Sequence, residues 1–370
     1  MRYYLMSMLN KFILLFLFFL VIYFFLLTNE TICGVIGMNQ EEFIKAIDNV
    51  QEFNKNNSKG VNVSNALIQT FNIKGIELLN SKMNYLKFVD VNLDYSNIIN
   101  TKIENTTFTQ STLNKATLKD TFFKKCIFHD VAFDASNIVN VRFEDCEFNA
   151  CTLNDTIQRE SSFIQVKFNI ECIDSQMIEL NISKSSFNDC DFSRSEITNV
   201  HLKKCFMGEV SFSESQIKNV SMLLDKCQKI SFAQSIIQNF ELVAPEIGDI
   251  FGLRAKIQQF VIKSDVIQML NLINASANDI HVTSKKMDSF VIAVALIKDS
   301  DFTGFEINEE SIFRAAVLQN VLFDHIRFKH LIDIRNADLK QVTYSNCKLH
   351  PKSKVLRDSD TELSKSSLFY

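Results

Sequence analysis

Residues 121–153 read TFFKKCIFHDVAFDASNIVNVRFEDCEFNACTL, and this stretch decides the fold. A large apolar residue occupies every fifth position in it. These positions are Phe123, Phe128, Phe133, Ile138, Phe143, Phe148 and Leu153. An α-helix brings residues to one face every 3.6 positions and a strand every two, so a step of five fits neither element. The stretch therefore predicts another kind of repeating structure.

The step of five continues on both sides of this stretch. Successive series of apolar residues run over residues 73–178, 182–307, 313–328 and 334–349. One residue is lost between the first two series, and Gly252 and Ala277 are weak members of the second. Gln158 is the single break in the first series. A register held over so many steps predicts one repetitive architecture rather than separate elements.

A small side chain precedes many of these apolar centres by two residues, as at Ala116, Thr121, Cys126, Ser136 and Cys146. This small-x-Leu/Phe-polar-x pattern resembles the pentapeptide-repeat family over most of the chain. The resemblance implies an all-β fold, a right-handed parallel β-helix of square cross-section. Each pentapeptide would form one side, with the centre and the small residue pointing inward. Phe and Ile are commoner here than the Leu of the family's typical repeat.

Four sides of five residues make a coil of twenty, so residues twenty apart should stack at about the 4.8 Å spacing of strands. One such column contains only phenylalanine: Phe88, Phe108, Phe128, Phe148, Phe168 and, across the lost residue, Phe187. The next column places Gln158 among aliphatic residues. We predict a local slip that turns Ile157 inward and Gln158 outward, with an inward Gln158 as the alternative. From Ile73 to Leu349 the coils would form a rod on the order of 65 Å long.

The first 37 residues differ from the rest. Residues 12–27, FILLFLFFLVIYFFLL, are uninterrupted apolar sequence after Arg2 and Lys11. A spanning helix needs roughly 17–25 residues and the core of a signal peptide roughly 7–15, so this run lies on the border. The basic flank predicts a cytoplasmic N-terminus with the remainder outside. We expect an uncleaved anchor; a signal peptide cleaved near Val35-Ile36-Gly37 and a buried helix are the alternatives.

The remaining chain divides by pattern. Residues 38–57 predict an amphipathic capping helix that starts at the N-cap Asn39, with Glu42 three residues later. Residues 58–237 predict the regular β-helix. Residues 238–350 continue it less regularly, with large residues on opposite walls and strands such as Phe260-Val261-Ile262, so this part should flatten toward a two-sided solenoid. The polar residues 351–370 predict a disordered tail.

No motif of catalysis, cofactor binding or metal binding occurs, so we predict no catalytic, cofactor-binding or metal-ligating residue and no cofactor. His325 and His330, with Asp324 and Asp333, form the nearest approach to a metal patch, and solvated surface is the preferred interpretation. Most cysteines fall on inward positions: Cys126, Cys146, Cys151, Cys190, Cys205 and Cys347 at small positions and Cys227 at a centre. Cys33 and Cys172 fall outside the scheme. Buried thiols are expected, with a Cys126–Cys146 disulfide as the alternative.

These features favour a non-enzymatic solenoid, anchored in the membrane through residues 12–27 or exported, that acts as a scaffold or protein-interaction surface. Its location would be a single-pass membrane protein with the solenoid on the non-cytoplasmic side, or a secreted or periplasmic protein after cleavage. Two alternatives stay open: a DNA-mimicking protein that binds topoisomerases, and a carbohydrate-active β-helix enzyme. The net charge of −4 argues against a nucleic-acid partner. A protein partner is expected, with end-to-end or side-by-side self-association as a further alternative.

Overall fold

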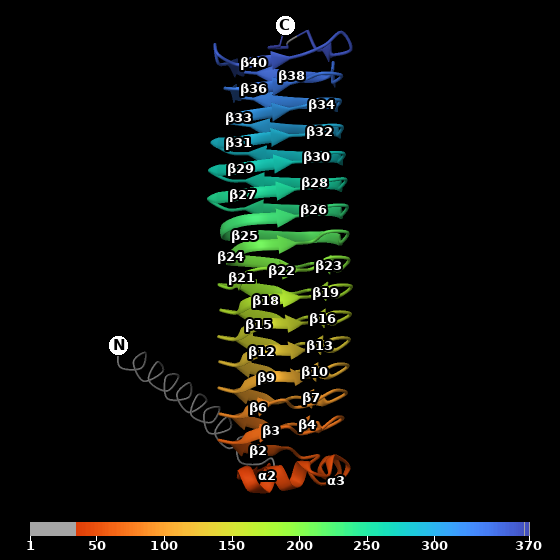
Figure 1. Ribbon diagram of the computed structural model, residues 1–370, viewed down its shortest axis with the longest axis vertical. Coiled ribbons are helices and arrows are strands. Elements are labelled where there is room, and N and C mark those ends of the chain that lie inside the picture. The colour runs from red at the N-terminus through yellow and green to blue at the C-terminus, as the bar shows by residue number, and fades with distance from the viewer. Residues whose placement is uncertain (1–34, 366, 370) are drawn as a thin grey trace, which may run out of the picture.

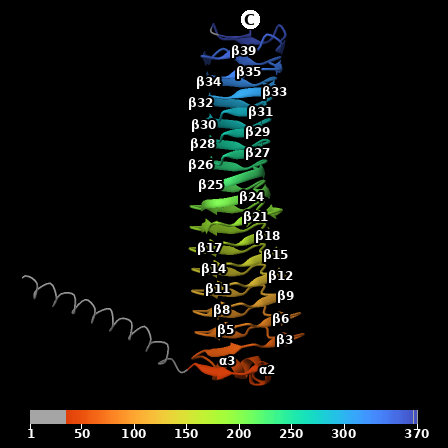
Figure 2. The same cartoon turned by 90° about the vertical axis from the view of Figure 1, so that its left-hand side faces the viewer.

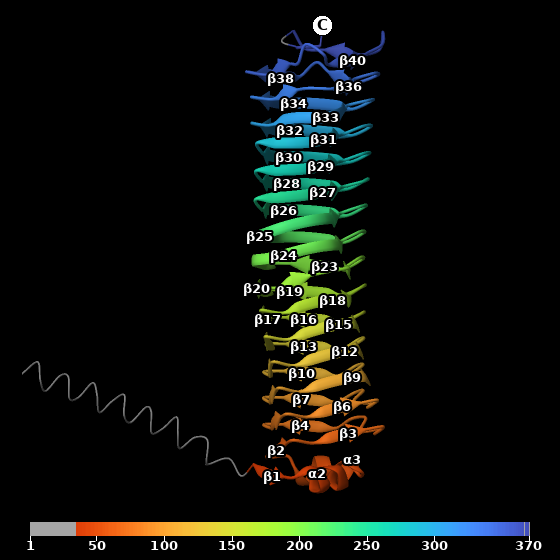
Figure 3. The same cartoon turned by 60° about the vertical axis from the view of Figure 1, so that its left-hand side comes forward.

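The computed structural model describes residues 35–365 and 367–369. They form a straight rod of stacked coils, with two short helices at one end and the C-terminus at the other (Figure 1). The rod keeps a similar width along its length in the turned views (Figures 2 and 3). The apolar run 12–27 and Cys33 lie outside the described residues. Among the described residues, no helix is long and apolar enough to cross a membrane.

The lower half of the rod is built from short strands, most of them three residues long. In chain order they are β1 (Ile36–Met38), β2 (Val61–Ser64), β3 (Leu67–Gln69), β4 (Glu77–Leu79), β5 (Lys82–Asn84), β6 (Lys87–Val89), β7 (Asn97–Ile99), β8 (Lys102–Glu104), β9 (Thr107–Thr112), β10 (Thr117–Lys119), β11 (Phe122–Lys124), β12 (Ile127–Ala132), β13 (Asn137–Val139), β14 (Arg142–Glu144), β15 (Glu147–Thr152), β16 (Ile157–Arg159), β17 (Ser162–Ile164), β18 (Lys167–Glu171), β19 (Gln176–Ile178), β20 (Asn181–Ser183), β21 (Ser186–Phe187), β22 (Cys190–Asp191) and β23 (Glu196–Thr198).

The upper half begins with longer strands and ends with short ones. They are β24 (His201–Ser211), β25 (Gln216–Ser231), β26 (Ile236–Val243), β27 (Glu246–Phe251), β28 (Lys256–Lys263), β29 (Val266–Asn271), β30 (Ser276–Thr283), β31 (Lys286–Val291), β32 (Leu296–Thr303), β33 (Glu306–Ile312), β34 (Val317–Asp324), β35 (Arg327–Phe328), β36 (Leu331–Asp333), β37 (Asp338–Leu339), β38 (Val342–Ser345), β39 (Lys348–Leu349), β40 (Lys354–Leu356) and β41 (Glu362–Leu363).

Parallel pairing twenty residues apart confirms the predicted coil. Phe123 of β11 pairs with Phe143 of β14, and Phe128 of β12 pairs with Phe148 of β15. In the lower half, the residue at almost every corner adopts the left-handed region, with φ of 52° at Lys125, and in the upper half two corners of most coils do so. This conformation is sterically unfavourable for residues with a Cβ, and among these Asn and Asp tolerate it best. Polar residues at the corners thus allow a solenoid that uses few glycines.

The predicted phenylalanine column is confirmed. Its rings stack almost parallel, with centroid distances of 4.8 Å between Phe88 and Phe108 and 4.7 Å between Phe128 and Phe148. The column crosses the lost residue, since Phe168 stacks on Phe187 at 4.8 Å. These rings are buried. Burial of large aromatic side chains, together with ring contacts, is the main force holding the coils together.

The lost residue lies earlier than the sequence indicated. The prediction placed Ile173 and Ile178 inward, but both are half-buried on the outside, and Cys172 and Met177 occupy the inward positions. The register shift falls where β18 pairs with β15, so that side has four residues instead of five. Cys172 and Ile173 are both apolar and either could occupy the inward position. The strand pairing with the previous coil selects Cys172.

The predicted slip at Gln158 is wrong. Gln158 is 4% exposed and points inward, whereas Ile157 is 37% exposed. The register of β16 explains this, because Asn137 pairs with Ile157 and Ile138 with Gln158 without a shift. A slip would break that pairing.

The chain enters the rod through a helical cap. α2 (Gln40–Ile47) and α3 (Val50–Asn56) replace the single predicted helix over 38–57. Asn39 and Glu42 form the expected capping box, with distances of 3.0 and 2.9 Å. The helix ends after Ile47, and a second helix begins at Val50 with Asn49 as its N-cap. The buried residues Phe43 and Phe53 cover the open end of the first coil.

The first strand lies inside the predicted leader. Residues Ile36 to Met38 of β1 pair with β2, so the solenoid starts before residue 38. The predicted boundary at residue 37 is therefore corrected.

Residues 238–350 continue the same stack of coils. β26 pairs with β28, β28 with β30 and β30 with β32, all in parallel. Strands of six to eight residues replace pairs of three-residue strands, while apolar residues five apart, such as Ile257, Ile262 and Ile267, stay buried. The flattening toward a two-sided solenoid stays a prediction. The large residues that alternate with small ones, such as Phe240, Phe260 and Phe290, are buried.

The predicted disordered tail is wrong. β40 pairs with β36 and β41 with β37, and Phe369 is 3% exposed. The Phe369 ring contacts Phe328 at 5.5 Å and Tyr344 at 5.4 Å. The tail is polar on average, yet its few apolar residues cover the core at the upper end of the rod. The prediction of disorder rested on average composition, which does not reveal these few apolar residues.

Candidate interaction surface

The cysteines line the interior as free thiols. Cys126, Cys146, Cys151, Cys172, Cys190, Cys205 and Cys227 are buried, and Cys347 is half-buried. Burial raises the pKa of Cys151 to about 11 and that of Cys190 to about 12. Burial also raises the pKa of Cys126, whose thiol lies beside that of Cys146. Cys126, Cys151 and Cys190, held neutral and away from solvent, are poor nucleophiles, so they act as packing groups.

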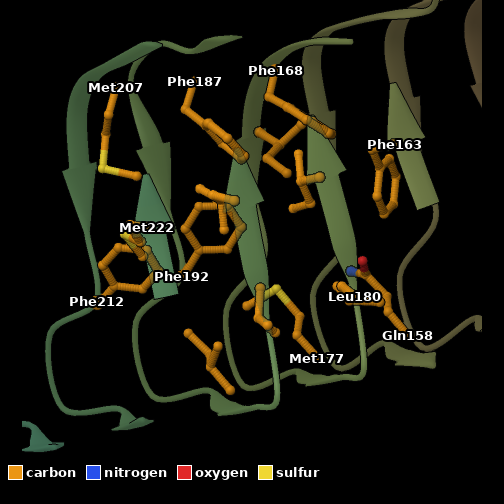
Figure 4. Close-up of a pocket in the computed structure, with 15 residues that line it drawn as sticks. Gln158, Phe163, Phe168, Met177, Leu180, Phe187, Phe192, Met207, Phe212 and Met222 are labelled. Carbon is orange, nitrogen blue, oxygen red and sulfur yellow. The ribbon is translucent and has the colours of Figure 1, made fainter. Parts of the chain in front are cut away.

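Gln158 and Cys172 form a small polar cluster within the apolar interior. The Gln158 amide donates to Thr156 Oγ1 and to Cys172 Sγ, both at 3.2 Å. A cavity of about 40 Å³ lies beside the cluster, and Gln158, Phe163, Phe168 and Met177 are among the residues that line it (Figure 4). Phe168 and Met177 flank the shortened side, where the coils fit less closely. The cluster satisfies its own amide donor, so packing accounts for it.

The histidines singled out from sequence do not converge. His325 lies 2.8 Å from Asp324, while the Asp333 carboxylate accepts two hydrogen bonds from Arg335. His330 lies in a shallow surface hollow with Asn308 and Leu331. Across residues 35–365 and 367–369, no cluster of three or more His, Cys, Asp or Glu could hold a metal ion. His325 and His330 thus lie on the exposed surface, whereas Asp333 is buried beside Arg335.

Polar ladders cover much of the outside. Asn239 donates to Asn219 at 3.0 Å, and Asn219 donates to Asn199 at 3.1 Å, each across one coil. Lys124 and Glu144 pair in the same way at 2.8 Å. Both signs of charge alternate in such ladders. The described surface is thus a mixed one rather than a uniformly acidic one.

One side of the rod differs from the other three because it is a turn rather than a strand. We call it the turn wall. Its inward residues are Ile73, Leu93, Leu113, Phe133, Leu153, Cys172, Phe192, Phe212, Phe232, Gly252, Leu272, Ile292, Phe313 and Ile334. The residue after each of these has a backbone N–H that the strand ladder does not use. Each coil must find another acceptor for that group or leave it open.

In the lower half, side chains of the turn wall accept these N–H groups. Asp94 Oδ1 accepts from Asn114 N at 2.8 Å, Asn114 Oδ1 from Asp134 N at 2.9 Å, and Asp134 Oδ1 from Asn154 N at 2.9 Å. Further up, Asp191 accepts from Ser193 N at 2.9 Å. The lower turn wall is consequently polar and closed to further hydrogen bonding along this row.

In the upper half, the same wall becomes apolar. We call its outward residues the apolar strip: Phe251, Leu253, Ile273, Ala293, Val294 and Ile312. Leu253 is 41% exposed and Val294 55% exposed. Leu253, Ile273 and Ala293 follow one another from coil to coil, because Arg254 N donates to Ile273 O and Asn274 N donates to Ala293 O, which stacks these turns. Asn271 interrupts the neighbouring column between Phe251 and Ile312. Contiguous exposed apolar surface marks sites of interaction.

The acceptors disappear together with the polar side chains. Within the described residues, no protein group accepts from the backbone N–H of Leu253, Ala293 or Arg314. Ile273 N is the exception in the strip, since it donates to Asn271 Oδ1 at 3.2 Å. The strip therefore offers open hydrogen-bond donors among apolar side chains.

The geometry defines the class of protein as a parallel β-solenoid with sides of five residues. A family model described as pentapeptide repeats, in eight copies, matches residues 92–130. The match confirms the resemblance found in the sequence: the solenoid is built from pentapeptide repeats. No curated protein sequence matches the chain.

Solved structures give distant likenesses. QnrB1, a plasmid-mediated fluoroquinolone resistance protein, is 13% identical over 42% of this chain and 85% of its own, with a TM-score of 0.22. HetL, a pentapeptide-repeat protein involved in heterocyst differentiation regulation from the cyanobacterium Nostoc sp. strain PCC 7120, is 9% identical over 85% of this chain and 100% of its own, at 0.24. A polysaccharide lyase from human gut microbiota is 8% identical over 85% of this chain and 82% of its own, at 0.25. At these identities and TM-scores the likenesses carry no argument about this chain.

The apolar strip was not among the features predicted from the sequence. Its signal is present in the sequence: Leu253, Ile273 and Ala293 are twenty residues apart and each follows an inward residue. The step of five draws attention to inward positions. The strip becomes visible only when outward positions are also compared coil by coil.

Proposed function

We propose that this solenoid is a non-enzymatic scaffold that binds another protein on its upper turn wall. The observation that carries the proposal is the apolar strip, which interrupts an otherwise polar wall. Contiguous apolar side chains that stay exposed to water are unfavourable, and such patches usually mark a site that a partner covers. The thiols described above pack in the interior, and the ion pairs belong to the polar ladders of the surface.

Position-specific photo-crosslinking in the source cell tests this proposal. A photoreactive phenylalanine derivative at Leu253 should give partner adducts. The same group at Lys115, an exposed corner residue of the lower turn wall, is the matched control and should give few. Equal labelling at both positions, or none at either, would contradict the proposal.

We further propose, from the sequence alone, that residues 12–27 anchor the chain in a membrane with the rod on the non-cytoplasmic side. Cell fractionation followed by sizing tests this location. Full-length chain in the membrane fraction supports an anchor, and a shorter exported chain supports cleavage. Full-length chain in the cytosol would rule out both.

The mixed charge of the surface bears on the DNA-mimicking alternative. Ion pairs such as Lys226–Glu246 at 2.9 Å and Lys229–Glu209 at 3.0 Å place both signs along the rod. A duplex mimic needs a surface that is mainly acidic. The paired ladders therefore favour a protein-binding scaffold.

A further inference from the structure

The length of the apolar strip and its unpaired hydrogen-bond donors indicate what kind of partner would fit it. It spans three coil steps from Phe251 to Ile312, or about 14 Å at the strand spacing. Its width is that of one five-residue side. An α-helix, about 10 Å across with its side chains, would cover such a wall along the rod axis.

The open polar groups around the strip are donors. Besides the N–H groups of Leu253, Ala293 and Arg314, two guanidinium groups flank it, those of Arg254 and Arg314. Neither of these side chains has an ion-pair partner among the described residues. Asp333 lies near Arg314, but both of its carboxylate oxygens accept from Arg335, at 2.9 and 2.6 Å. A partner must therefore bring acceptors, and carboxylates satisfy both kinds of donor best.

We propose that the upper turn wall binds an amphipathic helix of a partner protein, with an apolar stripe and a carboxylate near each end of it. Because a helix rises 1.5 Å per residue, carboxylates about ten residues apart would meet Arg254 and Arg314. The inference rests on the proposed scaffold function and specifies the class of partner. Apolar contact would supply affinity, and the two arginines would select the acidic helix.

The chain's own leader fits this role poorly. Residues 1–34 contain a single carboxylate, Glu30. Phe251 lies about ten coils above β1, or roughly 50 Å, whereas residues 28–34 extend at most about 25 Å. Only the far end of the apolar run would reach the base of the strip.

A second copy fits poorly as well. Two strips packed antiparallel about their midpoint would bring Arg254 of one chain against Arg314 of the other. Open N–H groups would also face open N–H groups, with no acceptors between them. Like charges and unpaired donors both disfavour that dimer.

Peptide binding to the full chain tests the proposal. One probe is a fluorescein-labelled helical peptide with a leucine stripe and two glutamates ten residues apart; the other carries lysines in place of those glutamates. We expect the acidic peptide to bind about tenfold more tightly, since two charge contacts of about 0.7 kcal/mol each correspond to that factor. Fluorescence anisotropy at low salt gives both dissociation constants.

Matched variants localise the effect. Arg254→Glu with Arg314→Glu should reverse the preference between the two peptides. Lys115→Glu, at the equivalent corner of the lower turn wall, should leave it unchanged. Leu253→Ser should weaken both peptides, while Ile236→Ser, an exposed residue on another wall at similar height, should weaken neither. Circular dichroism of each variant confirms that the rod is intact.

Several outcomes would overturn the inference. Equal binding of the two peptides, or an unchanged preference in the double arginine variant, would contradict an acidic partner. A concentration-dependent dimer in sedimentation that Leu253→Ser abolishes would assign the strip to a second copy. If neither peptide binds while crosslinking still concentrates at Leu253, the acidic helix is wrong and the scaffold function stands. If crosslinking also fails, the scaffold function is wrong too.

Discussion

The lower and upper halves of the turn wall share one backbone but differ in what covers it. Below, Asp94, Asn114 and Asp134 form a ladder that accepts the N–H of each following turn. Above, Leu253 and Ala293 occupy the equivalent positions and leave N–H groups open. The interior continues through both halves without a break. This solenoid thus separates its fold, carried by inward residues, from its surface, which each coil can vary.

The largest expected effect tests whether the interiors of the two halves are equivalent. Phe128→Ala in the lower half and Phe260→Ala in the upper half should each lower the free energy of unfolding by about 3–5 kcal/mol, since each leaves a cavity in the core. Urea denaturation followed by circular dichroism measures both. Phe206→Ala, an outward residue, is the control and should cost far less. A large loss in one half alone would show that the halves are held by different forces.

A smaller effect tests the ladder of the turn wall. Asn114→Ala removes the acceptor for Asp134 N–H and should cost about 1 kcal/mol. The converse change is Ala233→Asn, which places an acceptor one coil below Leu253 N–H and should stabilise the chain by about 0.5–1 kcal/mol. The urea midpoints of both variants give the comparison. If Ala233→Asn is neutral or destabilising, the N–H of Leu253 is not an unmet donor.

The smallest expected effect concerns His281 of β30 and Asp301 of β32, a hydrogen-bonded pair in the upper half. Partial burial opposes the charging of His281, but hydrogen bonds to Asp301 and Asp279 outweigh it and raise the pKa of His281 above its ordinary 6.5. The stabilisation is therefore full below pH 6.5 and is lost as the pH rises through the higher folded pKa. NMR titration of the imidazole should show this raised pKa. Asp301→Asn should lower it, and an unchanged value would contradict the contact.

Much of the fold follows from the sequence because inward positions obey a strict geometric rule. The step of five predicted the coil of twenty residues, the stack from Phe88 to Phe187, and the capping box at Asn39. The step could not place the lost residue, because Cys172 and Ile173 are adjacent and either could point inward. It also misplaced Gln158, whose amide is satisfied by Thr156 and Cys172, groups brought near it only by the fold.

The candidate surface was harder to predict for a physical reason. Outward residues are free of the packing rule, so their pattern reflects binding rather than folding. Leu253 and Val294 look like ordinary variation when they are considered singly. Their alignment in space, and the loss of acceptors beside them, depends on which of the four sides is the turn wall. That assignment requires the hydrogen-bond pattern of the structure.

Hydrogen exchange of the turn-wall amides tests the central claim most directly. In the free chain, the N–H groups of Asn114, Asp134 and Asn154 should exchange slowly, and those of Leu253, Ala293 and Arg314 should exchange rapidly. Addition of the acidic helical peptide should slow exchange at the second group and leave the first unchanged. Slow exchange at Leu253, Ala293 and Arg314 in the free chain, or no change when the peptide is bound, would contradict the account.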